Sequence, residues 1–587
     1  RTPLTSYHKR LGITQYFKTY GKDLERFIVK TDGISIANPK RVFESYLKLS
    51  TVNDFPDEAG SDGRREASVT PLAFGFKPGS TNEFPSTAPI VQIDRLRGDF
   101  AGGRWIFANF EGAIDAATIG TLVRTAAIGG HQIVARTRYA RLGSDENPVV
   151  DFELVAPKND ISVVAATVRI TDASGRPVAS LAIPEGTRST QKLKSLMPGY
   201  YEGAVNIEIK SSIGTSARES AGFGFWVTDG KPIGNGTPIT ADRHFLYRDG
   251  EPFPVTGTTF MSPSVARRFL LEPSVSEWNA EFLRMKNAGV NMIRTGIWTG
   301  WSLYLDEKGS VREEVLRAWE AFVLTAAKYD IPVIFTFYAF MPEMYGGENA
   351  YLDPKSIAGQ KRFLSAFASR VKGARAIIWD LINEPSFANP KMLWSCRPNY
   401  DKFEAAAWRE WLIKRYAEPD PSKLAAVLRD RWQLREDEDA FALPALKDFE
   451  NINIHVDRRP MRVVDFRLFA QDVFTGWAST MRETLRAAGN KEQLVMVGQD
   501  EAGTNDSPST QFHGDAMDLT GLHNWWANDD LLWDSVVTKN PNRANLVQET
   551  GLMFYEKQDG SAWRTDTQAA DLLERRDGTC CRCFAHD

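Results

Sequence analysis

The chain has 587 residues, more than one hydrophobic core usually supports, so about two to four domains are expected. Hydrophobic residues make up 42% of the chain and charged residues 25%, and no run is long enough to cross a bilayer, so no membrane partner is expected. A formal net charge of -4 gives no electrostatic reason to bind nucleic acid, so neutral or weakly charged partners are expected.

The two ends and the cysteines say little about the compartment. The chain does not begin with methionine, and no charged start followed by an apolar core is recognisable, so a secreted or periplasmic location stays open. Cys580, Cys581 and Cys583 crowd into the closing stretch while Cys396 stands alone, which does not make a disulfide framework. A zinc site from the closing cysteines and His586 is disfavoured, because their spacing fits no tetrahedral arrangement well, and no metal is expected.

The amino-terminal part of the chain is predicted to be rich in β-strands. Residues 1–145 hold strand-like runs at 103–108 and 131–136 between turn-rich stretches. Residues 146–230 are more regular, because short strand-like runs recur between turn signals, which predicts a small, immunoglobulin-like β-sandwich. The runs of this second part lie at residues 161–170, 203–209 and 222–227.

The rhythm of the pattern changes after residues 229–238, a segment dense in glycine and proline that marks a domain boundary. In residues 241–587, strand-like runs alternate with amphipathic helical patterns, which predicts a parallel sheet with helices outside it. A (β/α)8 or TIM barrel has this alternation. Seven strands are expected, at residues 253–260, 290–294, 331–337, 376–382, 493–498, 519–523 and 544–548.

Two features depart from a regular barrel. A helical insertion is expected at about residues 391–460, where Trp408, Leu412 and Trp432 recur at roughly helical spacing. The insertion is expected to form a lid or wall near the site, although packing within it would also explain these residues. An eighth strand is missing, so the barrel is expected to lack its last strand and helix, either because the chain is truncated or because its end comes from a shifted reading frame.

Two strand ends carry the most informative residues. Residues 376–385 form a largely apolar run that stops at an Asn-Glu-Pro triplet. Such a run indicates a strand buried on both faces, and the proline disfavours its continuation, so Glu384 is expected at the carboxyl end of the strand, where TIM barrels carry out catalysis. A second such run, residues 544–551, includes Glu549 near its end. Two glutamates on separate strand ends are what hydrolysis of a glycosidic bond usually requires.

The segment Trp-Asp-Leu-Ile-Asn-Glu-Pro resembles the acid/base strand of the retaining (β/α)8 glycoside hydrolases of clan A. Arg294, His523 and Glu549 fall where that clan's other signature residues are expected. The resemblance covers about residues 241–570; the helical insertion is similar to family 42 β-galactosidase-like enzymes, and the Asn-Glu-Pro context to family 5 cellulases and mannanases. It implies a carbohydrate substrate, no cofactor, Glu384 as the general acid/base and Glu549 as the nucleophile.

The resemblance also implies roles around the two carboxylates. Arg294 would keep the nucleophile ionised, while burial would keep the acid protonated, and Asn383 would direct its amide at the sugar 2-hydroxyl. His523 and Trp525 would line the same subsite. The clan usually has tyrosine where this chain has Trp525, and an indole cannot accept a hydrogen bond and places its donor differently. Further aromatic residues at or just past strand ends that would stack on sugars are Trp298, Tyr338 and Trp526.

Alternatives stay open for these residues and for the whole protein. Arg294 would also suit a structural ion pair, His523 a buried core position, and Asp500 with Glu501 a rival carboxylate pair after the fifth strand. The competing hypothesis for the protein is a non-catalytic carbohydrate-binding or scaffold protein with a degenerate barrel. The sugar, the linkage, internal or terminal cleavage and the oligomeric state are not encoded in any recognisable pattern.

Overall fold

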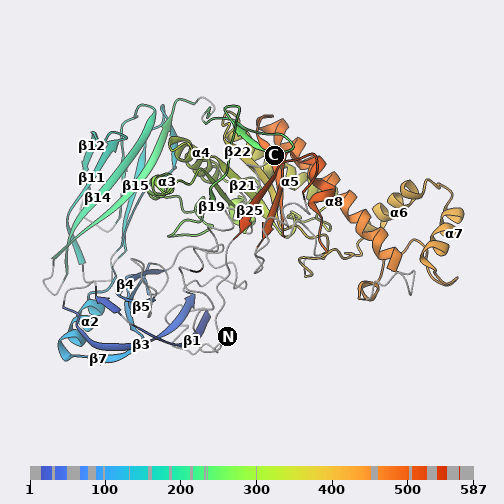
Figure 1. Cartoon of the computed structure of the whole chain (residues 1–587). Helices are drawn as coiled ribbons and strands as arrows, with labels where there is room; N and C mark the ends of the chain where they lie inside the picture. The colour runs from blue at the N-terminus through green and yellow to red at the C-terminus, as the bar shows by residue number, and fades with distance from the viewer. Residues whose placement is uncertain are drawn as a thin grey trace. The chain divides into compact units, whose positions relative to one another are not determined.

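The chain divides into two compact units, each described by itself below (Figure 1). The first comprises Arg1–Lys231 with Met261–Glu281 and Phe554–Leu572, and the second the remainder. No helix in the described part of the chain is long and apolar enough to span a membrane. The computed structural model describes residues 15–24, 26–29, 33–48, 67–76, 87–96, 100–130, 132–155, 161–183, 188–211, 216–230, 233–234, 236–298, 300–389, 391–450, 460–500, 506–524, 539–550 and 568.

The first unit is rich in strands, and its first part holds two small sheets and a helix. The helix, α2 (Ala116–Ile128), was not predicted; it begins where the Asp115 side chain accepts a hydrogen bond of 2.6 Å from the Thr118 backbone N–H. One sheet has the strand order β1 (Gln15–Asp23), β3 (Ile36–Lys48) and β7 (Phe110–Ile114). The other has the order β2 (Arg26–Val29), β4 (Ala67–Phe76), β5 (Thr87–Arg95) and β6 (Arg104–Ala108).

Two further sheets of the first unit share one hydrophobic cluster, which includes Phe152, Val168 and Phe225. The three-stranded sheet has the order β13 (Arg188–Lys192), β10 (Val149–Val155) and β8 (Gln132–Thr137). The five-stranded sheet has the order β12 (Pro177–Ala182), β11 (Ile161–Asp172), β14 (Gly199–Ser211), β15 (Ser216–Thr228) and β9 (Arg141–Gly143). The immunoglobulin-like sandwich and the predicted domain limits at residues 145, 230 and 241 stay predictions.

The second unit holds a barrel-like parallel sheet of seven strands. Six of them begin within two residues of a predicted strand, and the first is shorter than predicted. The segment expected to lack an eighth strand lies outside the described residues. In order across the sheet the strands are β19 (Gly257–Thr259), β20 (Met292–Gly296), β21 (Val333–Ala339), β22 (Ile377–Asn383), β23 (Leu494–Asp500), β24 (Thr520–Asn524) and β25 (Asn545–Thr550).

A shared interior shows that this sheet curls. The hairpin of β16 (Ile239–Ala241) and β17 (Leu246–Arg248) packs into the same interior through Ile239 and Leu246. Strands far apart in the sheet can bury side chains together only if the sheet bends back on itself. One buried residue from each of β20 to β25, or from just before the strand, joins this cluster: Met292, Ile334, Ile378, Met496, Leu519 and Leu546.

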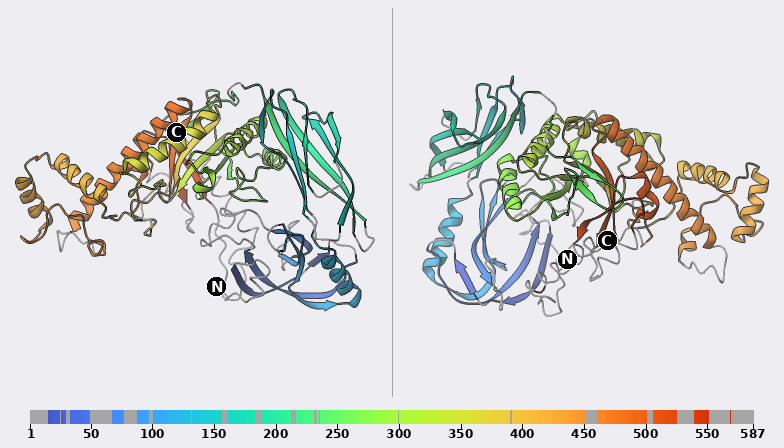
Figure 2. Two further views of the ribbon diagram at one scale, coloured as in Figure 1. Left: turned by 180° about the vertical axis from the view of Figure 1, so that it is seen from behind. Right: turned by 45° about the horizontal axis from the view of Figure 1, so that its top comes forward.

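Helices cover the outer face of the sheet, as predicted. The helices that follow strands are α3 (Val275–Asn287), α4 (Glu313–Lys328), α5 (Pro354–Arg370) and α8 (Pro460–Ala488). The Trp319 ring of α4 lies 4.3 Å from the Phe335 ring of β21, and the Phe367 ring of α5 lies 5.6 Å from the same ring. Helices α5 and α8 run side by side (Figure 2).

The predicted insertion is helical and packs on the start of α8. It contains α6 (Lys402–Tyr416) and α7 (Pro421–Trp432). Trp408 and Trp432 are fully buried with their rings stacked at 6.0 Å, and Trp408 also contacts Phe469 of α8. Packing within the insertion, the alternative to a lid, therefore accounts for these tryptophans.

Candidate active site

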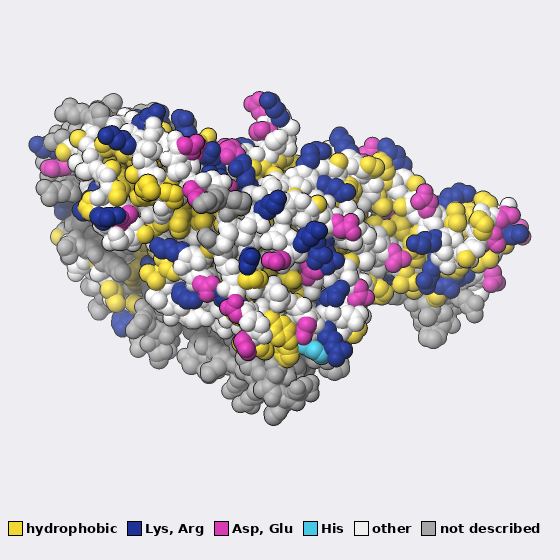
Figure 3. Space-filling model, turned by 90° about the horizontal axis from the view of Figure 1, so that it is seen from above, with side chains coloured by type: hydrophobic (Ala, Val, Ile, Leu, Met, Phe, Trp, Pro, Cys, Tyr) yellow, Lys and Arg dark blue, Asp and Glu magenta, His cyan; other side chains and the backbone are white. Residues whose placement is uncertain are grey.

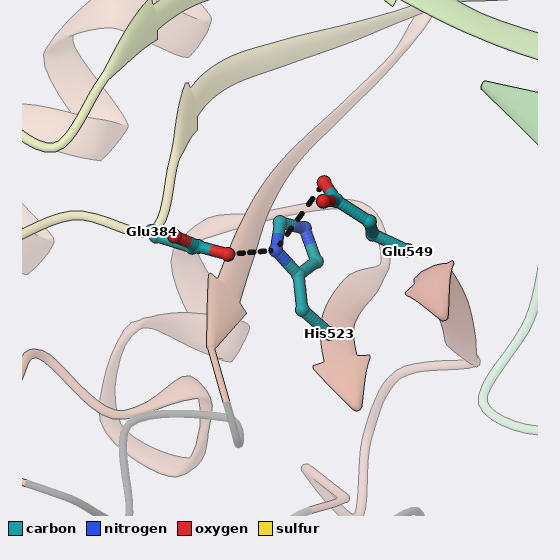
Figure 4. A group of neighbouring side chains, drawn as sticks. All are labelled: Glu384, His523 and Glu549. Carbon is teal, nitrogen blue, oxygen red and sulfur yellow. Dashed lines mark hydrogen bonds and ion pairs between the residues drawn. The ribbon is translucent and has the colours of Figure 1, made fainter. Parts of the chain in front are cut away.

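The predicted catalytic pair converges at the carboxyl ends of the barrel strands. Glu384 directly follows β22, and Glu549 lies on β25. One oxygen of each carboxylate and one ring nitrogen of His523, on β24, all lie within 4.8 Å of one another. Figure 4 shows both carboxylates reaching toward the same His523 ring nitrogen. Residues distant in the sequence thus form one cluster, in the place predicted for catalysis.

Glu384 is held by its backbone and by two side chains. Its backbone has a left-handed φ of 50°, and its N–H donates to the Gly498 carbonyl at 2.8 Å. The carboxylate oxygen Oε1 lies 2.9 Å from His523 Nδ1, and Oε2 accepts a hydrogen bond of 3.0 Å from the indole Nε1–H of Trp394. The carboxylate therefore has a fixed orientation, with one oxygen toward the buried histidine and the other toward Trp394.

The surroundings of Glu384 set the direction of its pKa. Burial raises the pKa, but the hydrogen bond and charge of His523, the Trp394 indole and the nearby Arg294 together bring it below its usual value. The prediction that burial keeps this carboxyl protonated is wrong for this arrangement, because it considered burial without the hydrogen-bond donors around the group.

Glu549 is paired with the buried Arg294, as predicted. Arg294 Nη1 donates to Glu549 Oε2 at 2.6 Å, and the arginine side chain is 2% exposed. The same guanidinium donates from Nη2 to Asn383 Oδ1 at 2.6 Å. Because the Asn383 oxygen faces Arg294, its Nδ2 is the group that could meet a sugar hydroxyl.

Asp380, which was not predicted as a site residue, anchors a polar layer beneath the two glutamates. Its fully buried carboxylate oxygen Oδ2 accepts from Arg294 Nη2 at 3.1 Å, Thr336 Oγ1 at 2.7 Å and Gln548 Nε2 at 2.7 Å. This layer lies two residues beyond the apolar interior cluster on each strand. That spacing is the sequence signal that could have located it, because every second residue of a strand faces the same side.

His523 is fully buried and bonded through both ring nitrogens. Gln548 donates from Nε2 to Asp380, so its Oε1 faces His523 Nε2 at 3.0 Å and that nitrogen carries the proton. The other ring nitrogen, Nδ1, faces Glu384 Oε1 at 2.9 Å. The space for this contact depends on Gly498, where a Cβ atom would lie 1.7 Å from Gln548 Oε1 and 2.6 Å from His523 Nε2.

Two predicted sugar-stacking residues are buried. Trp298 is 4% exposed, and its ring lies 5.7 Å from the Arg294 guanidinium carbon. Tyr338 is 1% exposed, and its hydroxyl lies 3.2 Å from that of Tyr345. These positions favour packing, the alternative considered for both side chains.

Several predicted residues lie outside the described part of the chain. Trp525, Trp526 and Glu501 are among them, so the tryptophan expected beside His523 and the rival pair of Asp500 with Glu501 stay predictions. The closing cysteines and His586 lie outside that part too.

The cluster of Glu384, His523 and Glu549 also has the donor types of a metal site. Arg294 Nη1 lies 2.6 Å from Glu549 Oε2, and His523 Nδ1 already faces Glu384 Oε1. A cation placed there would meet the guanidinium charge at close range, so the residues fit a metal ion poorly.

Comparison with known proteins gives one family match. Residues 248–554, more than half of the chain, match the family model Cellulase (glycosyl hydrolase family 5). No curated protein matches.

Similar solved structures include a β-glucuronidase from Bacteroides uniformis, 11% identical, with a TM-score of 0.31 over 95% of this chain and 56% of that one. A β-mannanase from the blue mussel Mytilus edulis is 13% identical, with a TM-score of 0.32 over 59% of this chain and 89% of that one. An endo-1,4-β-mannanase from Eisenia fetida is 13% identical, with a TM-score of 0.33 over 57% and 86%. The chain spans about half the length of the β-glucuronidases, 43% and 56% of the first two.

Proposed function

Since the chain belongs to glycosyl hydrolase family 5 and is thus a glycoside hydrolase, we propose that it cleaves a β-glycosidic bond in an oligo- or polysaccharide with retention of configuration. The observation that carries this proposal is the approach of Glu384 and Glu549 to within 4.8 Å, measured between one oxygen of each. Retaining enzymes place their carboxyl groups about 5 to 5.5 Å apart, whereas inverting enzymes leave about 6.5 to 9.5 Å for a water molecule. The separation supports the retaining pathway.

Glu549 is the proposed nucleophile. Its carboxylate attacks the anomeric carbon, the bond to the leaving-group oxygen breaks, and a glycosyl ester forms on Glu549. The Arg294 guanidinium donates to Glu549 Oε2 at 2.6 Å and so fixes the orientation of the attacking carboxylate. Asn383, oriented by the same arginine, donates to the sugar 2-hydroxyl, a contact that strengthens as positive charge develops on the ring.

Glu384 is the proposed general acid and then general base. It gives a proton to the leaving oxygen, later takes one from the water that attacks the ester, and so returns to its starting state. A bound sugar removes water from the carboxyl and moves its pKa upward, toward the protonated form that a general acid needs. His523 Nδ1, 2.9 Å from Oε1, holds the carboxyl in place through both roles.

Labelling tests the nucleophile. A 2-deoxy-2-fluoroglycoside of the sugar found in a substrate screen is expected to trap the ester on Glu549, located by mass spectrometry of the digested protein, and Glu549→Gln is expected to lose both labelling and turnover. NMR of the first product should show the β-anomer. A label on another residue, or an α-anomer formed first, would refute the assignment.

Chemical rescue tests the acid/base. Glu384→Ala is expected to lose turnover of aryl β-glycosides by roughly a hundredfold or more and to regain part of it in azide, with a β-glycosyl azide as product. If wild type and Glu549→Gln behave identically on a panel of aryl β-glycosides while still binding sugar, the non-catalytic alternative holds instead.

A further inference from the structure

Trp394 lies on the loop after Glu384 and turns back toward it. Its backbone has a left-handed φ of 54°, and its N–H donates to Ser386 Oγ at 2.7 Å. The indole Nε1–H donates to Glu384 Oε2 at 3.0 Å, and the ring packs edge to face on Phe340 at 4.8 Å. Despite these contacts the residue is 51% exposed. A large flat apolar surface is thus held open directly beside the proposed acid.

The two oxygens of Glu384 differ in what can reach them. Oε1 faces His523, which is fully buried and held from behind by Gln548. Oε2 faces the half-exposed Trp394. A glycosidic oxygen that takes its proton from Glu384 therefore approaches Oε2, and the leaving group arrives on the Trp394 side.

Resting on the function proposed above, we propose that Trp394 forms the leaving-group subsite. Its indole N–H orients Glu384 Oε2 toward the glycosidic oxygen, and its exposed ring carries the leaving sugar. Pyranose rings present a face of C–H groups that packs well on an indole and needs no charge for recognition. The ligand class is accordingly a neutral sugar at the reducing side of the cleaved bond.

Two substitutions separate the two parts of this role. Trp394→Phe keeps a flat ring and removes the N–H, whereas Trp394→Ala removes both. The substrates are the β-linked disaccharide of the sugar that the enzyme cleaves, which has a sugar leaving group, and the β-glycosyl fluoride of the same sugar, whose leaving group is a single small anion. The readout is the ratio of kcat/KM on the disaccharide to kcat/KM on the fluoride, together with its pH profile.

Trp394→Ala is expected to lower this ratio about tenfold, because stacking on the leaving sugar is lost. Trp394→Phe is expected to keep most of the ratio but to move the alkaline limb of kcat/KM to higher pH, because Glu384 loses a donor that favours its ionised form. Trp105→Ala, at a 39% exposed tryptophan of strand β6 in the first unit, is the matched control and should leave both readouts unchanged.

An unchanged ratio in Trp394→Ala, or a Phe variant as impaired on the disaccharide as the Ala variant, would overturn the stacking role. An alkaline limb that stays in place in Trp394→Phe would overturn the N–H role. These failures differ from failure of the proposed function, in which the wild-type protein itself would turn over neither substrate and Glu549→Gln would match it.

Discussion

The side-chain amide of Gln548 determines which ring nitrogen of His523 carries the proton. Gln548 bridges Asp380 and His523 Nε2, and the acceptor-only carboxylate of Asp380 fixes which end of the amide faces the histidine. Nδ1 is thereby directed to Glu384. Gln548 is a positioning residue in the proposed mechanism, because it acts on the acid through the histidine.

Replacing Gln548 by Met tests this role. The variant keeps a similar volume but frees His523 to change its protonated nitrogen, so we expect kcat to fall about tenfold or more and the alkaline limb of its pH profile to move. Gln493→Met is the control, because Gln493 is also buried and fully bonded, to Trp379 Nε1 and to the Val371 and Ala374 carbonyls.

Both variants should lose about 1 to 3 kcal/mol of unfolding free energy in urea, since each leaves buried groups unpaired. Only Gln548→Met should change the pH profile. Equal changes in both profiles would reduce Gln548 to a structural role.

Residue type and strand position were enough to predict some of the site. Glu384 and Glu549 were predicted because each carboxylate comes at the end of an apolar strand, and Arg294 because its position resembles a signature position of clan A. Asp380 and Gln548 were missed because their roles depend on partners from other strands. Trp394 was missed because no sequence pattern tells that a loop residue ten positions after Glu384 turns back to it.

Among the elements, α6 carries a buried carboxylic acid, Glu404, in its first turn. Glu404 is 1% exposed and accepts the backbone N–H groups of Asn399 at 2.7 Å and Tyr400 at 2.8 Å. Burial raises its pKa to about 7 despite these hydrogen bonds. The surface formed by α6 and α7 carries interspersed acidic and basic side chains (Figure 3), so the buried acid contrasts with the solvated charges around it.

Glu404 should make the insertion less stable as the pH rises. Its pKa is higher in the folded state than the ordinary value of 4.5. Its contribution to the free energy of unfolding is therefore fully present below pH 4.5 and is lost as the pH rises through about 7. The integrated loss is roughly 3 kcal/mol. Urea unfolding at pH 5 and pH 8 should show this fall in wild type and a flatter response in Glu404→Gln.

Glu410→Gln is the control for this experiment, because Glu410 lies exposed on the same helix. The unfolding free energy of Glu410→Gln should fall between pH 5 and pH 8 as that of the wild type does. Parallel curves for wild type and Glu404→Gln would show that this acid does not titrate in the range stated.

The barrel strands were easier to predict than the insertion's role. A run such as residues 377–383 is largely apolar, buried along its whole length and followed by Pro385, so the strand and its end follow from local chemistry. The tryptophans of α6 and α7 have helical spacing whether they face a ligand or another helix, so spacing alone could not decide between a lid and a packed core.

For the whole molecule, the important contact is the one that joins the second and seventh strands of the sheet. Arg294 and Glu549 are 255 residues apart in the sequence, and the same guanidinium also bonds Asp380 on the fourth strand. Sequence pattern could predict each strand but not this convergence, because closure depends on how far the whole sheet bends. The polar layer therefore links the curvature of the barrel to the geometry of the site.

Removing Arg294 should weaken the fold as well as the chemistry. Arg294→Met leaves the fully buried Asp380 carboxylate without its cation, so we expect a loss of about 3 to 5 kcal/mol in urea unfolding. The double variant Arg294→Met/Asp380→Asn should regain part of that stability without regaining activity, because the buried charge is gone but Glu549 still lacks its partner.

Arg375→Met is the control, since Arg375 and Glu492 form an exposed pair at 3.9 Å, with side chains 55% and 60% exposed. That change should cost less than about 1 kcal/mol. If the Arg294 variant unfolded at the same urea concentration as this control, the polar layer would not stabilise the barrel.

The left-handed backbone conformation of Glu384 and Trp394 creates a trade-off between thermal stability and activity. In this conformation a residue with a side chain lowers the free energy of unfolding by about 1 to 2 kcal/mol, whereas glycine adopts it without that cost. Laboratory evolution of this protein for thermal tolerance alone would be drawn toward glycine at these two positions and would discard the proposed acid and its indole neighbour. Selection for higher thermal stability therefore needs an assay of catalytic activity at every round.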